Sequence, residues 1–390
     1  MKRRVIFMCN ALDDLTRIGR DITTDSPAAT KKIIMLCKAL RISGVTAVIL
    51  SMGRGGEIAC WKNFSALVRR VDGVPIIYIP FSTIPIFSHL LSSIALAYCI
   101  FILRIRRFTH LIYYNRTATF IPSLLLSRVL GYVNILDLED GETSGVRSVL
   151  KFLQLKIVSQ LFDKICIKAL LACSALKAFT SIRPVLCYYG TASPSPATPR
   201  FQSKKLTVLM SGTLSHETGA ELLIDAIVML RQKNEPWVRD IRFEITGKGE
   251  SLDRFHLLAS ELSIPNLVVH GRLSSPEYLN ILSSADIGLS LKLIGGPYAN
   301  TTFPSKVIEY AASGVLVLTT EISDVRKVLG EGAIYLKRDE PSELIKLLKF
   351  IALNQKDALN YSIVGRDAVQ KICMPRIAGE KLSEFIFGSV

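Results

Sequence analysis

The sequence predicts two α/β domains, each built on a doubly wound, mostly parallel sheet. Three observations lead to this fold class. The chain has 390 residues, which is long for one hydrophobic core and comfortable for two. Short β-rich runs alternate with longer stretches of helical spacing, the pattern of βαβ units. A stretch rich in proline and small polar residues, 191–205, divides the chain near its middle.

The second half shows the alternation most clearly. Strands are expected at residues 206–211, 241–246, 267–270, 286–291 and 315–319, and helices at 220–231 and 251–262. Strands separated by helices pair in parallel, so their carboxyl ends meet at one edge of the sheet, where ligands of open α/β sheets bind.

The first half follows the same pattern less regularly. Strands are expected at 5–8, 47–52, 75–80, 111–115, 134–138 and 185–189, and helices at 30–40, 85–103, 118–129 and much of 146–178. The basic start of the chain and the apolar run after it resemble a signal peptide. The run is short and Asp13 and Asp14 follow at once, so a first β-strand is the better interpretation.

The predicted domains are 1–190 and 206–370, joined by the linker 191–205. Three prolines in the run 193–199 cannot continue a helix or a central strand. Residues 371–390 are expected to form a C-terminal helix that can pack back on the first domain. No internal repeat is present.

Composition excludes several classes of protein. The chain is 49% hydrophobic, which excludes a disordered protein. Its eight cysteines and five histidines are scattered without zinc-ligand spacing, so we expect buried, reduced thiols, no metal and no cofactor. No G-x-G-x-x-G opens a helix after a first strand, which disfavours a dinucleotide dehydrogenase.

The net charge of +15 lies entirely in residues 1–200, which hold 26 Lys and Arg against 11 Asp and Glu. This asymmetry suggests an anionic partner for the first half, either membrane lipid or a phosphate-bearing acceptor. Nucleic acid is disfavoured because no recognition motif is present. The apolar run 84–103 is long enough to span a membrane, but it contains polar residues and has strand-like segments on both sides. We favour a buried or surface-docked helix, with an interfacial helix as the intermediate case.

Glycines follow several expected strands of the second half. They are Gly212, Gly247, Gly271 and the pair Gly295 and Gly296. Glycine permits close backbone approach, and exposed N–H groups at such turns suit phosphate.

The segment 301–314 carries the sharpest signal. Pro304 suits the first turn of a helix, and Gly314 suits its end. Lys306 and Glu309 are three residues apart and therefore share one face. A cation at a helix start suits an anion, and a carboxylate one turn later can accept two hydrogen bonds from a ribose diol. A surface ion pair is the alternative interpretation.

Residues 303–314 are similar to the F/P-S-K-x-x-E-Y-x-A-x-G box of the retaining GT-B glycosyltransferases called glycosyl transferases group 1, or family four. Residues 211–226 resemble that family's first donor loop and helix, and 245–250 and 269–273 resemble its other two donor loops. The resemblance implies a GT-B fold and transfer of a sugar from a nucleotide-diphosphate sugar with retention.

The resemblance also implies the roles of individual residues. Glu309 would hold the donor ribose, and Lys306 the diphosphate. The remaining donor-binding candidates are Gly212, Thr213, Gly247, Lys248, Arg272, Leu273, Phe303 and Ser305. Three positions depart from the family pattern: Thr213 replaces an Arg, Thr218 a Lys and Thr301 an acid. Lys306 is therefore expected to carry more of the phosphate charge, helped by Lys248, Lys292 or the helix start.

Acceptor candidates lie in the first half. The run 137–142 places four carboxylates after an expected strand, and burial would raise some of their pKa values. Asp140 is a third catalytic candidate beside Lys306 and Glu309, and Glu142 and Arg116 are candidates for the acceptor side. A solvated turn is an equal alternative for the acidic run.

We therefore expect a hexosyl- or N-acetylhexosaminyltransferase acting on a glycan or lipid-linked acceptor in bacterial surface polysaccharide synthesis. Its expected location is the cytoplasmic face of the plasma membrane. Two alternatives stay open: a sugar-nucleotide epimerase of GT-B fold, and a catalytically degenerate subunit of a membrane glycosylation complex, suggested by the three threonines.

Overall fold

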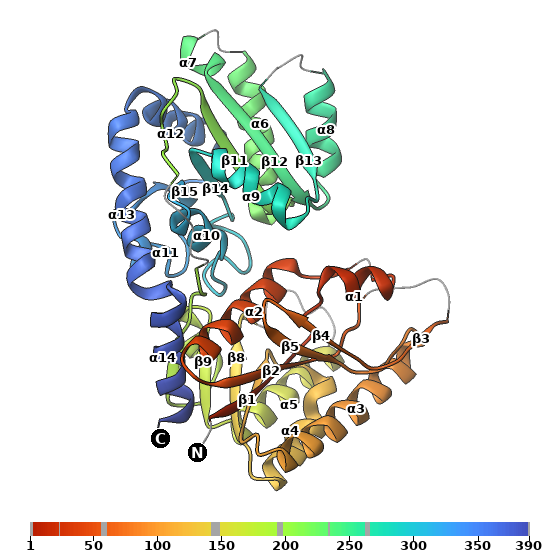
Figure 1. The fold of residues 1–390 in the computed structure, drawn as a ribbon. Coiled ribbons are helices and arrows are strands. Elements are labelled where there is room, and N and C mark those ends of the chain that lie inside the picture. The colour runs from red at the N-terminus through yellow and green to blue at the C-terminus, as the bar shows by residue number, and fades with distance from the viewer. Residues whose placement is uncertain are drawn as a thin grey trace. The chain divides into compact units, whose positions relative to one another are not determined.

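The computed structural model describes residues 3–22, 24–55, 61–141, 149–192, 198–232, 235–261 and 266–388 (Figure 1). The chain divides into two compact units. Unit 1 comprises Met1–Thr191 and Pro375–Val390, and unit 2 comprises Ala192–Met374.

Unit 1 is built on an eight-stranded sheet of order β10-β9-β8-β7-β1-β2-β5-β4. Its strands are β1 (Arg4–Cys9), β2 (Thr46–Ser51), β4 (Leu67–Val71), β5 (Val74–Tyr78), β7 (His110–Tyr114), β8 (Val133–Leu138), β9 (Lys168–Leu171) and β10 (Val185–Cys187). All neighbours pair in parallel except β4, which pairs antiparallel with β5. A separate antiparallel pair joins β3 (Asn63–Phe64) to β6 (Phe81–Ser82).

Helices cover both faces of this sheet. The chain moves from β1 to β2 through α2 (Pro27–Ile42), and in the opposite direction to β7, β8 and β9 through α3 (Pro85–Ile105), α4 (Ile121–Val129) and α5 (Val149–Ile165). Right-handed crossovers in opposite directions place α2 on one face and the other three helices on the other (Figure 1). The C-terminal helix α14 (Pro375–Phe387) packs against α2. Short helices are α1 (Asp14–Gly19), η1 (Ala118–Phe120) and η2 (Ser174–Phe179).

The six strands expected in the first half are all present, and Arg4–Cys9 is a central strand of the sheet. Two expectations need correction. The helix expected through 146–178 ends at Ile165, and Lys168–Leu171 forms β9. The apolar run there is fully buried on both faces of a parallel sheet, which periodicity alone does not separate from a buried helix. β4 was also not expected, because its centre is charged and exposed at the sheet edge.

Unit 2 contains a parallel six-stranded sheet of order β13-β12-β11-β14-β15-β16. The strands are β11 (Leu206–Thr213), β12 (Ile241–Lys248), β13 (Leu267–Gly271), β14 (Ile287–Ser290), β15 (Leu316–Thr320) and β16 (Ala333–Leu336). The first five confirm the sequence expectation, and β16 was not predicted. Helices are η3 (His216–Thr218), α6 (Ala220–Arg231), α7 (Pro236–Arg239), α8 (Leu252–Glu261), α9 (Ser275–Ser284), α10 (Lys306–Ala312), α11 (Val325–Leu329), α12 (Pro341–Leu353) and α13 (Gln355–Cys373).

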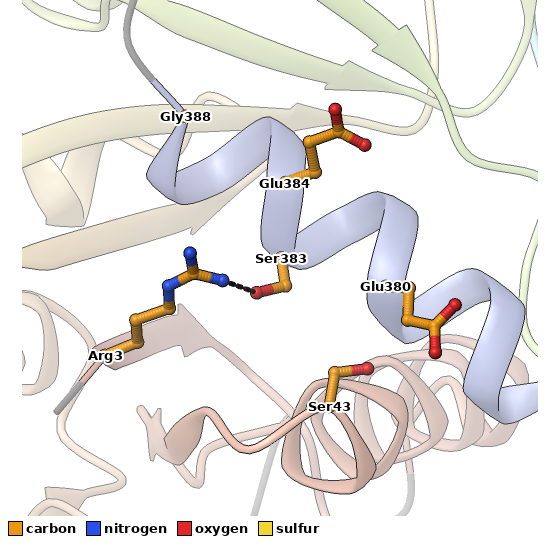
Figure 2. A pocket seen from close by; sticks show the side chains of 6 residues that line it. All are labelled: Arg3, Ser43, Glu380, Ser383, Glu384 and Gly388. Carbon is orange, nitrogen blue, oxygen red and sulfur yellow. Dashed lines mark hydrogen bonds between the residues drawn. The ribbon is translucent and has the colours of Figure 1, made fainter.

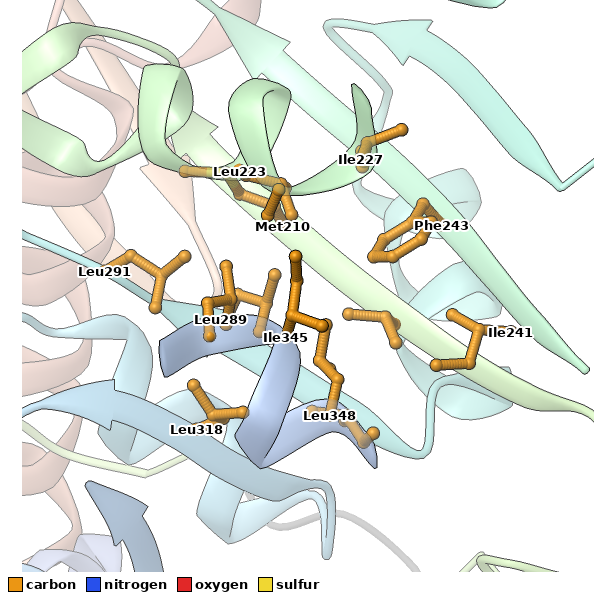
Figure 3. Packing of buried hydrophobic residues seen from close by; sticks show 14 of the residues in the cluster. Met210, Leu223, Ile227, Ile241, Phe243, Leu289, Leu291, Leu318, Ile345 and Leu348 are labelled. Atoms are coloured by element: carbon orange, nitrogen blue, oxygen red, sulfur yellow. The ribbon is translucent and has the colours of Figure 1, made fainter. Parts of the chain in front are cut away.

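The core of unit 2 lies between the sheet and the helices α6 and α12. Figure 3 shows side chains from β11, β12, β14 and β15 meeting those of the two helices, including Met210, Phe243, Leu223 and Ile345. Burial of these apolar surfaces holds the strands in register and fixes where each strand ends. The candidate functional site stands on those strand ends.

The expected linker contains residues 193–197, which lie outside the described part of the chain. The residues that follow are tied to unit 2. The buried Arg200 donates to the carbonyl oxygens of Leu282, Ser283, Ala285 and Ser313 at 2.6–3.2 Å. The backbone N–H of Phe201 donates to Asp286 Oδ1 at 2.8 Å. The seven cysteines in the described ranges are free thiols, five of them buried.

Candidate functional site

The carboxyl ends of β11 and β12 meet at two glycines. Gly212 and Gly247 are register partners with φ of +118° and +143°. A Cβ on Gly247 would lie 1.8 Å from the carbonyl oxygen of Gly212, so a side chain there is sterically excluded. The two strands therefore carry no side chain at the residue before their carboxyl ends, where the sequence predicts close backbone approach.

The segment 303–314 contains α10, which packs against β14 and β15. The helix begins at Lys306, with Ser305 as its N-cap, so Pro304 precedes the cap and is not in the first turn. The reason is local: Val307 N–H bonds the carbonyl of Pro304 and Ile308 N–H that of Ser305, which are tighter i to i+3 bonds. The expected position of Pro304 is therefore wrong by two residues.

Lys306 and Glu309 face each other, as their spacing predicts. Lys306 Nζ lies 2.7 Å from Glu309 Oε2, and the side chains are 27% and 16% exposed. The pair is partly buried, so it is not the fully exposed ion pair of the alternative interpretation. Burial alone would lower the pKa of Lys306, but the Glu309 carboxylate outweighs it and raises that pKa, which keeps the ammonium charged.

Lys306 lies beside the glycine that precedes the end of β11. A Cβ on Gly212 would lie 3.6 Å from Lys306 Cε. The ammonium also lies 4.5 Å from the ring centroid of Tyr278 and donates to its hydroxyl at 3.1 Å. Tyr278 belongs to α9, so three separate elements converge on one cation.

A network of hydroxyl groups lies beside the Lys306 ammonium. Ser211 Oγ lies 2.8 Å from Tyr310 OH and 3.3 Å from Tyr278 OH. Burial raises the pKa of both tyrosines, so their hydroxyls stay protonated. A Cβ on Gly288 would lie 2.4 Å from the Tyr310 ring, so this glycine makes room for it.

Tyr278 and Ser211 were not predicted as site residues. Tyr278 lies 28 positions before Lys306, and the sequence around it does not predict a hydrogen bond to that lysine. Tyr310 directly follows Glu309, which is the one sequence signal that pointed at the network.

The two threonines that replace family cations differ in their surroundings. Thr213 is exposed at the end of β11. Thr218 closes a turn: its Oγ1 accepts the Ser215 N–H at 3.0 Å and donates to the carbonyl of Thr213 at 2.8 Å. Thr218 therefore has a structural role in this chain.

The other donor-binding candidates surround the strand ends with varying exposure. Lys248 ends β12 and Arg272 follows β13 as an exposed residue, while Leu273 and Phe303 are partly buried and Ser305 is exposed. Lys292 follows β14 and donates to Thr302 Oγ1 at 2.6 Å. Lys292 is thus within the same loop cluster, with its ammonium bound to a hydroxyl.

The acidic run of unit 1, residues 137–142, begins within β8. Lys32 Nζ from α2 lies 2.5 and 2.7 Å from the two carboxylate oxygens of Glu139. Asn115 Oδ1 accepts the N–H of Glu139 at 2.8 Å. Burial, reinforced by Glu139, raises the pKa of Asp137 well above its usual range, as expected for crowded carboxyls.

Of the first-half candidates, Arg116 is the one whose interpretation the structure changes. Arg116 is buried and bonds Asp163 Oδ1 at 2.7 Å and the carbonyl of Phe179 at 2.8 Å. Its guanidinium joins the segment after β7 to α5 and η2 within unit 1, so the structure gives it a structural role in place of an acceptor contact. Asp140 is exposed after β8, and Glu142 lies outside the described residues.

A hollow of about 340 Å³ lies elsewhere in unit 1 (Figure 2). It is lined by Arg3, Ser43 and residues of α14, and Arg3 donates to Ser383 Oγ at 3.0 Å. Arg3 precedes β1, so the hollow is at the amino ends of the strands, away from the edge where such sheets bind ligands. None of the sequence-predicted site residues lines it.

Comparisons with known proteins give a family match and related folds. The family model described as "Glycosyl transferases group 1" matches residues 194–368, nearly all of unit 2. A phosphatidylinositol N-acetylglucosaminyltransferase component from Arabidopsis thaliana is 23% identical over 165 residues. That match covers 41% of this chain and 34% of the relative, so the chain spans about a third of the relative's length.

Solved structures resemble the chain over its whole length. Anabaena Alr3699/HepE in complex with UDP and glucose has a TM-score of 0.68 at 13% identity, covering 98% of both chains. WaaG, a glycosyltransferase involved in lipopolysaccharide biosynthesis, has a TM-score of 0.61 at 12% identity, covering 98% of this chain and all of that one. Sucrose-phosphate synthase from Thermosynechococcus elongatus has a TM-score of 0.67 at 12% identity, covering 98% of both chains. The chain has the GT-B fold of two Rossmann-like domains, and the family match with this fold supports a glycosyltransferase.

Proposed function

We propose that this chain transfers a sugar from a nucleotide-diphosphate sugar to a hydroxyl of a glycan or lipid-linked acceptor, with retention of configuration. One observation carries the proposal. The partly buried Lys306–Glu309 pair lies beside the backbone of Gly212, in the domain that matches glycosyl transferases group 1. A fixed cation and a carboxylate beside a stretch of strand that carries no side chain suit a diphosphate joined to a ribose.

In the proposed complex, Glu309 accepts hydrogen bonds from the ribose hydroxyls and Lys306 contacts the diphosphate. The pair holds both side chains in place before the donor arrives, so little ordering is needed on binding. The lack of a side chain at Gly212 and Gly247 lets the phosphates approach the backbone closely.

Lys306 carries the main catalytic role in this proposal. The leaving diphosphate gains negative charge as the bond to the sugar breaks, and a preorganised cation stabilises that charge. The departing phosphate oxygen takes the proton of the acceptor hydroxyl as that hydroxyl attacks from the same face. Asp140, exposed after β8, remains the candidate for positioning the acceptor.

The names of similar proteins support a choice of donor and pathway within the proposal. HepE was solved with UDP and glucose, and the Arabidopsis relative is named as part of an N-acetylglucosaminyltransferase. Both favour a UDP-linked hexose or N-acetylhexosamine. WaaG is involved in lipopolysaccharide biosynthesis, which supports a role in bacterial surface polysaccharide synthesis. The proposed location is the cytoplasmic face of the plasma membrane.

A nucleotide-binding screen tests the proposal. Isothermal titration with UDP, GDP, ADP and TDP should show one preferred base, and affinity for it should fall in Glu309→Ala. The preferred nucleotide sugar is then incubated with a membrane extract of acceptors, and the anomeric configuration of the product is read by NMR. Transfer with retention supports the proposal.

Other outcomes select the alternatives. A changed sugar nucleotide formed without acceptor would show an epimerase. No nucleotide binding by the folded protein would favour the degenerate subunit, the alternative suggested by Thr213, Thr218 and Thr301.

A further inference from the structure

Helix α3 has two apolar faces, and one of them is exposed. Its described residues from Phe87 to Ile105 make it the one helix in the described ranges that is long and apolar enough to cross a membrane. The exposed side chains recur every three or four positions and so form one stripe along the helix. The α3 stripe consists of Phe87, Leu90, Ile94, Tyr98, Phe101 and Ile105, which are 46–67% exposed.

The opposite face of α3 is built into unit 1. Ser92, Leu96 and Ile100 are fully buried. Ser93 Oγ donates to the carbonyl of Thr119 at 3.1 Å, and Tyr132 OH donates to the carbonyl of Ile100 at 2.7 Å. A membrane-spanning orientation would break these bonds and expose the core beneath the helix, so α3 stays docked.

The neighbouring helices of the same layer extend the apolar surface. On α4, Leu125 is 47% and Val129 is 83% exposed, and on α5 Phe152 and Ile157 are about half exposed. α4 packs against both α3 and α5. Large apolar side chains gathered in one helical layer are unusual for a surface that faces only water.

The charge of this part of the chain indicates what covers it. Residues 73–136 contain no Asp or Glu and five Arg. Arg106 and Arg107 are exposed at the end of α3, and Arg128 is exposed on α4. Two copies of this surface would bring arginine toward arginine, which opposes self-association. A bilayer with anionic headgroups would bury the α3 stripe in its apolar interior and pair its phosphates with the arginines.

An aromatic side chain lies near the other end of α3. Trp61 is 84% exposed. Its neighbour Lys62 donates its N–H to Thr83 Oγ1 at 2.8 Å, two residues before α3 begins. Tryptophan favours the headgroup level of bilayers because its ring is amphipathic.

We propose that the α3 stripe lies in the interface of an anionic bilayer, with Trp61 at the headgroup level and Arg106, Arg107 and Arg128 against lipid phosphates. The helix lies in the plane of the membrane and does not cross it. This inference concerns a different surface from the donor site and does not depend on the proposed reaction.

Vesicle flotation of the full chain tests this inference. Binding is expected to vesicles containing phosphatidylglycerol, and not to phosphatidylcholine alone. Ile94→Gln with Phe101→Gln should lower partitioning about tenfold or more, because two large apolar side chains leave the interface. Arg106→Gln with Arg107→Gln should weaken binding and flatten its salt dependence. The matched control is Leu279→Gln with Leu353→Gln, which removes two equally exposed apolar residues of unit 2 and should bind like the parent.

Trp61 gives a direct reading of depth. Brominated lipids should quench its fluorescence at a depth typical of interfacial helices, about 5–10 Å. The other tryptophan, Trp237, is buried in unit 2, so Trp61→Phe supplies the background. Parent and variants should show the same thermal unfolding.

Four results would overturn the inference. The first two are equal flotation of the parent and the Ile94/Phe101 variant, and equal binding to neutral and anionic vesicles. The third is a protein that alkaline carbonate leaves on the membrane and only detergent releases. The fourth is a dimer in the absence of lipid that this variant converts to a monomer. The last would assign the stripe to a second copy.

Discussion

Removing the ammonium of Lys306 is the sharpest perturbation of the donor site. Lys306→Ala deletes the cation that stands over Gly212 and leaves the Glu309 carboxylate without its ion partner. Because the leaving diphosphate gains charge in the transition state, the loss should appear in kcat more than in donor affinity. We expect kcat to fall about 10²–10³-fold, the range for one preorganised donor.

The same change should cost stability, and the structure bounds how much. At 2.7 Å and an effective dielectric constant of about 20, the pair attracts by roughly 6 kcal/mol before desolvation is subtracted. The side chains are 27% and 16% exposed, so the pair lies between surface and buried pairs. We therefore expect Lys306→Ala to lower the free energy of unfolding by about 1–3 kcal/mol.

Matched variants separate the two effects. Lys306→Met keeps the stem over the Tyr278 ring and should recover part of the stability but none of the rate. Lys306→Arg should recover only part of the rate, because the planar guanidinium group keeps the charge but has a different geometry from the compact ammonium group. Thr213→Arg should make Lys306 less critical, because position 213 is exposed at the strand end. Thr218→Lys is a poorer restoration, since it removes the hydroxyl that closes the 215–218 turn.

Single-turnover rates with the preferred donor and urea unfolding at pH 7 are the two assays. A Lys306→Ala rate within a few-fold of the parent would refute the reasoning and transfer the phosphate role to Lys248 or Lys292. An unchanged free energy of unfolding would refute the energetic part alone.

Four further changes test other parts of the structure. Tyr278→Phe removes the hydroxyl beside Lys306 but keeps the ring, so kcat should fall about tenfold with little change in KM, measured by steady-state kinetics. Gly247→Ala should destabilise unit 2 by more than about 3 kcal/mol in urea unfolding, because its Cβ would overlap the backbone of the neighbouring strand. Arg200→Ala should cost about 3 kcal/mol or more in the same assay, since four carbonyls lose their donor. Asp137→Asn should stabilise the protein increasingly as pH rises above about 4, by up to about 1.4 kcal/mol per pH unit, measured by urea unfolding across pH.

The sign of the Asp137 prediction follows from its raised pKa. Between the unfolded pKa and the folded pKa, the folded state binds more protons than the unfolded state, so parent stability falls as pH rises. Asparagine does not titrate and lacks this loss. Parallel pH profiles of parent and variant would contradict the assignment.

For Tyr278→Phe, an equal loss in stability and rate without a change specific to kcat would indicate a purely structural role.

The sequence by itself determined the two α/β domains and most of their strands. Alternating periods identify βαβ units, and parallel pairing then requires the strand ends to meet at one edge. The close position of Gly212 and Gly247 follows from that topology. The pairing of Lys306 with Glu309 follows from helix geometry, since residues three apart lie on one face.

Only the tertiary structure decided how those residues are supported. Tyr278 reaches Lys306 because α9 and α10 pack beside the same strand end, which no local pattern encodes. Arg116 was predicted as an acceptor-side residue from its place after a strand, yet its side chain bonds Asp163. Thr218 was noted only because it replaces a family lysine, and its hydroxyl accepts the N–H of Ser215. Local spacing determines which side chains lie on the same face of a helix or strand. Which partner that side chain meets depends on packing between elements far apart in the chain, and sequence spacing does not determine that packing.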